Sequence, residues 1–211
     1  MDMWLQTYGD EFALLAFAHF IAVISPGPDF LVTLRQSIQR GKIAALWTSF
    51  GIGVGILVHV AYIIFGMAVL LRDHPEIMRV FQWVGAAYLL WLALQCLRSS
   101  SVAQFSSNGD AVITEQSAWQ AWRLGFLTNA LNPKATMFFL ALYVNIINAL
   151  TPVLIQIGYG VWMSMVTGLW FSFVSYVMVQ PKVRQKFLRF GPWVDRVLGV
   201  LLVIVAIRLL W

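Results

Sequence analysis

The stretch Ser25–Asp29 reads SPGPD and interrupts a long apolar run of the chain. A second stretch, Asn132–Lys134, reads NPK and lies inside another apolar run. A proline within a helix removes one backbone hydrogen bond, and its ring collides with the preceding turn. Both runs are therefore predicted to be helices that break near their middles, and the rest of the chain is best understood from these two breaks.

The composition around the breaks is that of a membrane protein. Hydrophobic residues make up 60% of the 211 residues and charged residues only 11%, whereas a soluble domain has about 45–50% and about 25%. This composition argues against a water-soluble enzyme and against a nucleic-acid-binding protein, so the net charge of +5 is interpreted as a sign of membrane topology. The single cysteine, Cys96, excludes a disulfide within the chain and a cysteine-based metal site.

Six apolar stretches are long enough to cross a bilayer, which takes about 20 residues per helix. Lengths of this kind with so few charges favour helices over the strands of a barrel. We therefore predict an all-α membrane protein that forms a single domain over residues 1–211. The predicted spans are Phe12–Leu34, Ile43–Leu71, Ile77–Leu97, Trp122–Ile147, Pro152–Val179 and Trp193–Trp211.

Basic residues fall mainly on one side of the six predicted spans. The connections after the first, third and fifth spans carry nine Lys and Arg residues, and the opposite side carries three. By the positive-inside rule, the side with nine faces the cytoplasm, and both termini face outward. The segment Lys182–Arg189 is predicted to be the loop after the fifth span, where its charges set the topology. Binding of phospholipid headgroups is the alternative role of this segment. The nine are Arg35, Arg40, Lys42, Arg98, Arg123, Lys182, Arg184, Lys186 and Arg189, and the three are Arg72, Arg79 and Arg208.

The two halves of the chain share positions at a constant offset. Pro26 and Pro133 lie 107 positions apart, and the same offset places Gly51–Val54 (GIGV) on Gly158–Val161 (GYGV). Each half holds three predicted spans, so the second half enters the membrane upside down. This is the inverted repeat of many secondary transporters, which hold their substrate near the midplane, where helices of the two halves break. The expected parts are repeat one at about 12–98, a cytoplasmic loop at about 99–121 and repeat two at about 122–211.

Glycines recur in the second and fifth predicted spans. Small residues let helix backbones approach closely in a membrane. Close helix packing is therefore expected at these positions, and access of a substrate past a bare backbone is the alternative. The same faces offer a route to a homodimer. The glycines concerned are Gly51, Gly53, Gly55, Gly158 and Gly160.

Charged side chains inside the predicted spans are few, and such groups cost about 2.5–3.5 kcal/mol at the membrane centre and are functional by default. Asp29 lies on the first turn of the helix that restarts after the first break, where it is suited to bind an ammonium group or to carry a proton. Lys134 follows Pro133 directly and is suited to bind a carboxylate. The structural alternatives are an Asp29–Lys134 ion pair that only joins the two halves, and proline kinks without a ligand.

Two histidines also lie within the predicted spans. Histidine changes its charge near neutral pH, so His59 is a candidate for coupling transport to protons together with Asp29. A hydrogen-bonded core histidine is the alternative for His59. His19 lies two helical turns before Pro26 and is expected to face the bundle. The N–H groups at the start of each restarted helix, with the positive end of its dipole, form a seat for a carboxylate.

The order of these motifs resembles the LysE/RhtB family of bacterial amino-acid exporters. SPGPD is followed by a basic connection, Arg35–Lys42, then by a glycine-rich span, and finally by NPKA at Asn132–Ala135. The resemblance covers nearly the whole chain. It implies a multi-pass carrier of the bacterial inner membrane, an antiporter driven by the proton gradient. The outward side, on which the charge asymmetry places both termini, is then the periplasm. The residues expected to bind and translocate the substrate are Ser25 and the motif positions Pro26, Gly27, Pro28, Asp29, Asn132, Pro133 and Lys134.

The hypothesis from the sequence is therefore an exporter of a small zwitterionic amino acid that works by proton-coupled alternating access. The RhtB-type branch that the chain resembles exports threonine, homoserine and other neutral amino acids. The expected partners are this solute, protons and the lipid bilayer. No nucleotide-binding loop, cofactor motif or metal cluster is evident, so no cofactor or metal is expected.

Two alternatives of other classes stay open at this point. A metal-ion transporter is the first, although hard cations usually need more than one carboxylate and Asp29 is the only acid expected to be buried. A membrane-embedded enzyme is the second, although no convergent set of nucleophile, base and metal ligands is recognisable.

Overall fold

The computed structural model describes residues 2–25, 27–67, 77–98, 116–148 and 150–208, and every regular element in these ranges is a helix. The predicted all-α class is therefore confirmed. One element, η1, is a short π-helix that continues α3. The elements are α1 (Asp2–Ile24), α2 (Pro28–Gln39), α3 (Gly41–Tyr62), η1 (Ile63–Met67), α5 (Ile77–Arg98), α6 (Ala118–Ala130), α7 (Pro133–Asn145), α8 (Val153–Met178) and α9 (Pro181–Arg208).

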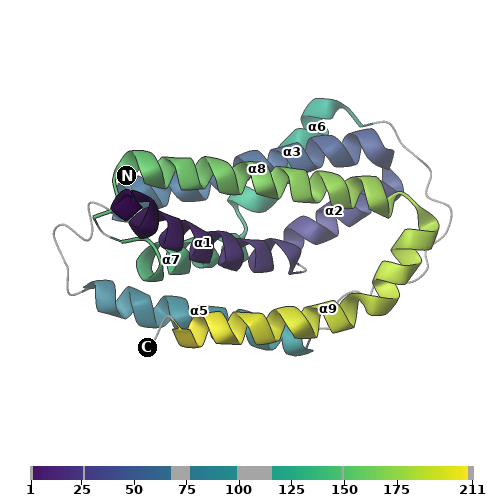
Figure 1. The fold of residues 1–211 in the computed structure, drawn as a ribbon. Helices are drawn as coiled ribbons and strands as arrows, with labels where there is room; N and C mark the ends of the chain where they lie inside the picture. Colours follow the sequence, from purple (N-terminus) through teal and green to yellow (C-terminus); the bar gives the residue numbers. More distant parts are fainter. Residues whose placement is uncertain (1, 26, 68–76, 99–115, 149, 209–211) are drawn as a thin grey trace.

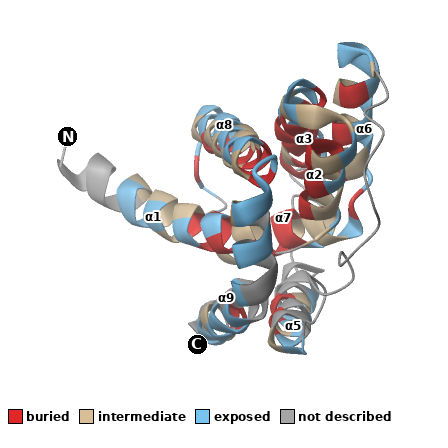
Figure 2. Ribbon diagram, turned by 90° about the vertical axis from the view of Figure 1, so that its right-hand side faces the viewer, coloured by how far each residue is buried: buried red, intermediate tan, exposed pale blue. Residues whose placement is uncertain are grey.

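The helices are arranged around α3. This helix packs against α6 on one side and against α8 on the other (Figure 2). At the opposite edge of the molecule α5 and α9 lie side by side, and α7 lies between the two groups in contact with α5. The start of α1 and the end of α9 lie at one end of the molecule, and the α2–α3 and α8–α9 junctions lie at the other (Figure 1).

Glycines bring α3 and α6 close together. A Cβ atom at Gly51 would collide with the backbone at Trp122, and one at Gly125 would collide with the backbone at Thr48. In a bilayer, water does not drive apolar helix surfaces together, so close packing of small residues is a main source of helix association. The glycines thus fix α6, which leads into the second break, against the centre of the molecule.

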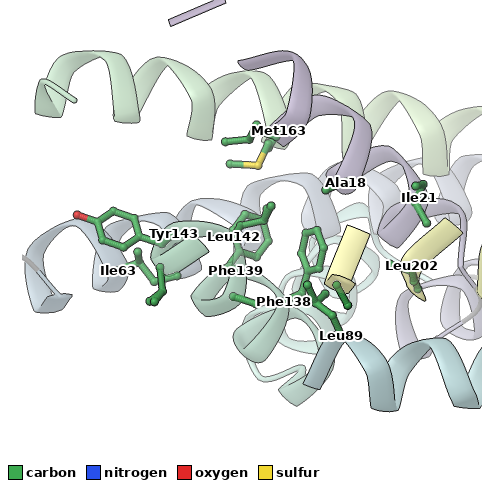
Figure 3. Close-up of a cluster of buried hydrophobic side chains, with 14 of the residues drawn as sticks. Ala18, Ile21, Ile63, Leu89, Phe138, Phe139, Leu142, Tyr143, Met163 and Leu202 are labelled. Atoms are coloured by element: carbon green, nitrogen blue, oxygen red, sulfur yellow. The ribbon is translucent and has the colours of Figure 1, made fainter. Parts of the chain in front are cut away.

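Two buried apolar clusters hold the helices that follow the breaks. In the larger cluster, Phe138 of α7 points toward Leu89 of α5, and Met163 of α8 lies on the other side (Figure 3). The smaller cluster joins α2, α3 and α8 and includes Phe30 and Ile52. Packing therefore fixes both α7 and α2 at the place where the breaks meet.

Two helices have the length and apolarity of a membrane span by themselves, Gly41–Gly66 and Val153–Met178. The pair Tyr8–Ile24 and Pro28–Gln39 qualifies as a third if the 49° bend between them is counted within one span. Large apolar side chains on α8 are exposed, such as Leu154 at 79%, which suits a surface that faces lipid. The number of six spans and the inverted repeat remain predictions.

The segment 181–189, predicted to be a loop, is helical in the structure. α9 begins at Pro181, and proline suits the first position of a helix because the N–H group that it lacks would have no partner there. The basic residues of this segment therefore lie on the first turns of a helix. They still count toward the topology, because the positive-inside rule includes residues close to the ends of the spans.

The cytoplasmic loop predicted at about 99–121 is described only in part. Residues 99–115 lie outside the described residues. α6 begins at Ala118 because a capping box precedes it: the Ser117 hydroxyl accepts a hydrogen bond from the Gln120 N–H group (3.2 Å), and the Gln120 side chain accepts one from the Ser117 N–H group (3.2 Å). The helix before the second break thus starts about a turn earlier than the predicted span.

Candidate functional site

The first break separates α1 from α2. The Ser25 N–H group closes the last turn of α1 with a bond of 3.1 Å, and Gly27 is the N-cap of α2, with extended backbone angles (φ −168°, ψ −170°). Pro28 begins α2, and Asp29 lies in its first turn, where the positive end of the helix dipole favours a carboxylate. Pro26 lies outside the described residues.

The second break separates α6 from α7 and is built differently. Leu131 ends α6, and Asn132 is the N-cap of α7. The Asn132 Oδ1 atom accepts a hydrogen bond from the backbone N–H group of Lys134 (3.0 Å). This bond satisfies one of the N–H groups that the start of a helix leaves without a partner. Pro133 begins α7, so this break is stabilised by its own residues.

A lysine from the second break reaches the first break, 109 residues earlier in the chain. Lys134 Nζ donates to the carbonyl oxygen (3.0 Å) and to the hydroxyl oxygen (3.1 Å) of Ser25. Its side chain passes close to Gly27, where a Cβ atom would lie 3.2 Å from both Cδ and Nζ of the lysine. A glycine at this position therefore leaves the space that the lysine needs.

Asp29 is held from the second half of the chain as well. Its Oδ2 atom accepts hydrogen bonds from the side-chain amides of Asn129 (3.0 Å) and Asn132 (3.2 Å). Polar groups inside a membrane have little access to water, so partners of this kind stabilise them. The structure thus brings together the two breaks that the sequence singled out.

A pocket lies where the two breaks meet, with about 450 Å³ of empty space, part of which is open to solvent. Pro28 and Pro133 begin the adjoining helices and are not part of its lining. The polar residues of the lining are His19, Ser25, Asp29, Asn129, Asn132, Lys134 and Thr167. The aromatic residues of the lining are Phe30, Phe138, Phe139 and Phe171.

Three buried acceptor atoms on residues of this lining have no hydrogen-bond partner within the described part of the chain. They are Asp29 Oδ1, His19 Nδ1 and Asn129 Oδ1. A buried acceptor without a partner costs about 1–3 kcal/mol, so a ligand that brings N–H or O–H donors is favoured here. Among the described residues, no three His, Cys, Asp or Glu side chains are placed to hold a metal ion.

His59 contacts the site from behind the pocket lining. Its buried ring stacks on Phe139, with ring centres 5.5 Å apart. Nε2 lies 2.9 Å from the backbone oxygen of Asn129, and a carbonyl only accepts, so Nε2 carries the hydrogen and donates. Nδ1 lies 3.2 Å from the hydroxyl of Tyr62. The ring therefore holds the last turn of α6, from which Asn129 reaches Asp29.

His19 lines the pocket from α1, where the sequence predicted only a side chain that faces the bundle. Its Nε2 atom lies 3.2 Å from the backbone oxygen of Met163 and 3.0 Å from Oγ1 of Thr167. Both partners belong to α8, so the imidazole ties the helix before the first break to the second half of the chain.

The glycines predicted for helix packing have different surroundings. A Cβ atom at Gly55 of α3 would lie 2.8 Å from the Oδ1 atom of Asn129, so this glycine makes room for a side chain of the site. On α8, Gly160 lies directly against Val60 of α3. At Gly158, by contrast, the position of a Cβ atom has no described atom within 4 Å.

The sequence did not single out two residues of the site, Asn129 and Thr167. Both are uncharged polar residues in apolar helices, so a search for ionisable groups passes over them. Their signal is an amide or a hydroxyl inside a predicted span, since such groups form hydrogen bonds across helices in membranes. Asn129 also lies three positions before Asn132, a spacing that places both amides on one side of the second break.

Comparison with known proteins gives a family and several relatives. The family described as LysE type translocator matches residues 20–211. The uncharacterized membrane protein YahN of Escherichia coli is 28% identical over 90% of this chain and 85% of its own length. The threonine efflux protein of Salmonella typhi is 25% identical over 90% of this chain and 92% of its own length. The homoserine/homoserine lactone efflux protein of Salmonella typhimurium is 27% identical over 63% of each chain. No solved structure matches the chain.

Proposed function

The chain belongs to the LysE type translocator family, and we propose that it exports neutral amino acids across the inner membrane of a bacterium. A translocator moves a solute without converting it, so the protein is a transporter and not an enzyme. The relatives named for threonine efflux and for homoserine efflux support a small neutral amino acid as the solute.

The meeting of the two breaks around one acid and one lysine is the observation that carries this proposal. One carboxylate oxygen of Asp29 has no partner among the described residues and lies on the pocket lining, which suits the α-ammonium group because hydrogen bonds between charged groups are the strong ones. Lys134 Nζ lines the same pocket and suits the α-carboxylate. An amino acid carries both charges on one carbon, so it complements both side chains at once.

In the proposed transport cycle, the solute replaces contacts between the breaks. Its carboxylate competes with Ser25 for Lys134 Nζ, and its ammonium group takes the unpartnered oxygen of Asp29. The first break is then less tightly tied to the second, and the half with α1 and α2 moves relative to the half with α6 and α7. This is alternating access between two inverted repeats of three spans each.

We assign proton coupling to Asp29. On the periplasmic side, a proton on Asp29 removes the charge that holds the ammonium group, and the amino acid leaves. On the cytoplasmic side, loss of the proton restores the charge for the next solute, so the carrier is an antiporter. His59 donates to the backbone carbonyl oxygen of Asn129, and a carbonyl oxygen accepts hydrogen bonds but does not pass protons on. His59 therefore acts on this step indirectly, through the position of Asn129. His59→Gln is therefore expected to change the pH dependence of transport.

The proposed orientation places both termini in the periplasm. The start of α1 and the end of α9 lie at the same end of the molecule (Figure 1). The basic residues Arg35, Arg40 and Lys42 belong to the region around the α2–α3 junction at the other end. The positive-inside rule assigns that end to the cytoplasm.

Uptake into everted membrane vesicles tests the proposal, because the interior of such vesicles corresponds to the periplasm. Vesicles with the protein are expected to accumulate labelled threonine and homoserine when the interior is acidic, and to accumulate less after an uncoupler collapses the gradient. Vesicles without the protein are the control. Absence of flux for a broad panel of amino acids would reject the proposal, and flux that ignores the pH gradient would reject only the proton coupling.

A further inference from the structure

Two buried acceptors on the pocket lining play no part in the proposed binding of the α-ammonium and α-carboxylate groups, and neither has a hydrogen-bond partner among the described residues. One is Oδ1 of Asn129, which lies against Gly55 of α3, and the other is Nδ1 of His19. The His19 side chain is only 1% exposed and lines the pocket from α1. It therefore forms a second polar position of the pocket, on a different element from Asp29 and Lys134.

The bonds of the other ring nitrogen fix the chemical state of Nδ1. Nε2 of His19 lies 3.2 Å from the carbonyl oxygen of Met163 and 3.0 Å from Oγ1 of Thr167. Because the carbonyl only accepts, Nε2 carries the hydrogen, and in a neutral imidazole Nδ1 is then an acceptor. The same two contacts fix the ring, since turning it over would break both of them.

The ammonium and amide donors of the pocket already act on other acceptors. Lys134 Nζ donates to Ser25, and the amides of Asn129 and Asn132 donate to Asp29. A donor group on the solute is therefore a suitable partner for the imidazole.

The surroundings of His19 indicate which kind of donor fits. The rings of Phe138, Phe139 and Trp162 have their centres 6.0–6.3 Å from the imidazole. A second ammonium group in this apolar wall would lack a carboxylate of its own, because Asp29 is the only acid among the described residues of the lining, and burying an unpaired charge is costly. A hydroxyl on a short carbon chain is neutral, donates one hydrogen bond and places its carbons against the rings.

We propose that His19 determines specificity: its Nδ1 atom accepts a hydrogen bond from a hydroxyl group on the side chain of the exported amino acid. This inference rests on the proposed function. A site built to bond a hydroxyl rejects the analogue without one, because the buried acceptor is then left unpaired. We expect a preference of at least about tenfold for threonine over valine and for homoserine over norvaline, pairs in which a methyl group replaces the hydroxyl.

Two substitutions separate the acceptor at Nδ1 from the contact with α8. In His19→Gln, the amide reaches the position of Nε2, so the donor toward Met163 is kept and the acceptor at Nδ1 is lost. In His19→Asn, the amide oxygen lies near the position of Nδ1, so the acceptor is kept and the contact with α8 is lost. His59→Gln is the matched control, because this second buried histidine is not part of the pocket lining.

Two measurements on the full-length protein test whether His19 recognises the hydroxyl group. The first is the ratio of threonine to valine uptake into everted vesicles, and the second is the thermal stabilisation of the purified protein in detergent by each amino acid. In wild type and in His59→Gln, the uptake ratio is expected to exceed about ten. In His19→Gln, the ratio is expected to fall toward one because threonine loses its advantage. His19→Asn is expected to retain part of the ratio.

The outcomes distinguish this inference from the exporter function. A ratio near one in wild type, or a ratio retained in His19→Gln, overturns the role of His19 and leaves the exporter function in place. Equal loss of threonine and valine uptake in a folded His19→Gln protein assigns the residue to the transport cycle and also overturns it. If wild type neither transports nor binds any amino acid, the exporter function fails and this inference fails with it. The wild-type ratios need no variant, so a ratio near one overturns the inference even if a substitution prevents folding.

Discussion

The two helix breaks are stabilised in opposite ways. The second break is capped by its own residue, because Asn132 Oδ1 accepts from the Lys134 N–H group. The first break has Gly27 as its N-cap, which brings no side chain. It is held instead by side chains of the second half, with Lys134 Nζ on Ser25 and the amides on Asp29. The second break therefore keeps its shape by itself, and the first break depends on it.

This difference suggests separate roles for the two breaks. Backbone groups freed inside a membrane need partners. A break whose partners come from the other half acts as a joint between the halves, because its bonds have to open when the halves move. A break that caps itself stays rigid during the same motion. Changes to the contacts of the first break are thus expected to affect transport most, and changes to the cap of the second are expected to affect stability.

The largest effect is expected for Asp29→Asn, which removes the charge from the joint. The new amide brings donor hydrogens where Asn129 and Asn132 already donate, and it no longer attracts an ammonium group. Hydrogen bonds to charged groups contribute about 1.5–3 kcal/mol each, so uptake of threonine into everted vesicles should fall about 100-fold. The amount of inserted protein is the control. Uptake at the wild-type rate would reduce Asp29 to a structural residue.

A smaller effect is expected for Lys134→Gln, which removes the bond from the second break to the first. Loss of the charged donor to Ser25 should lower uptake by about 10- to 30-fold. Lys134→Arg keeps the charge, but its larger planar head has to fit beside Gly27, so an intermediate rate is expected. Lys42→Gln is the matched control, because the ammonium of Lys42 lies over the ring of Tyr176 (4.2 Å) and away from the pocket.

Equal losses in Lys134→Gln and Lys42→Gln would contradict the special position of Lys134. They would show that transport responds to total charge and not to the contact between the breaks.

The sequence predicted the all-helical fold and the places of both breaks, because proline and charge are rare in membrane helices and therefore conspicuous. It also named Asp29 and Lys134, for the same reason. It did not predict their partners, since a hydrogen bond between distant segments depends on how the helices cross. Ser25 as an acceptor for Lys134, and Asn129 as a donor to Asp29, appear only once the first break has been placed against α6 and the start of α7.

The role proposed for His19 could not be predicted from the sequence either. An isolated histidine in an apolar run has the same pattern whether it faces a pocket or packs in a core. The distinction rests on Met163 and Thr167, which lie 144 and 148 positions away and fix one ring nitrogen. The loop predicted at Lys182–Arg189 was wrong for a different reason: charge indicated a connection, whereas the segment forms the first turns of α9, which begins at Pro181.

Two substitutions at the cap of the second break separate its own stability from its hold on the first break. Asn132→Ala removes both the capping oxygen and the donor to Asp29, so the free energy of unfolding should fall by about 1 kcal/mol and uptake should fall several-fold. Asn132→Ser keeps a capping oxygen but loses the amide donor, so it should lower uptake and retain most of the stability. Unfolding in detergent and vesicle uptake measure the two effects. Equal unfolding free energies for the two variants would contradict the self-capped second break.

The smallest effect is expected for Ser25→Ala, which changes the first break without removing its backbone acceptor. The hydroxyl oxygen accepts from Lys134 Nζ at 3.1 Å, and the carbonyl oxygen, which stays, accepts at 3.0 Å. One hydrogen bond contributes about 0.5–1.5 kcal/mol net, so the free energy of unfolding should fall within this range and uptake by no more than about threefold. A loss of uptake as large as in Lys134→Gln would mean that the hydroxyl itself contacts the solute. The first break would then be a binding site in its own right and not a joint held through its backbone by the second.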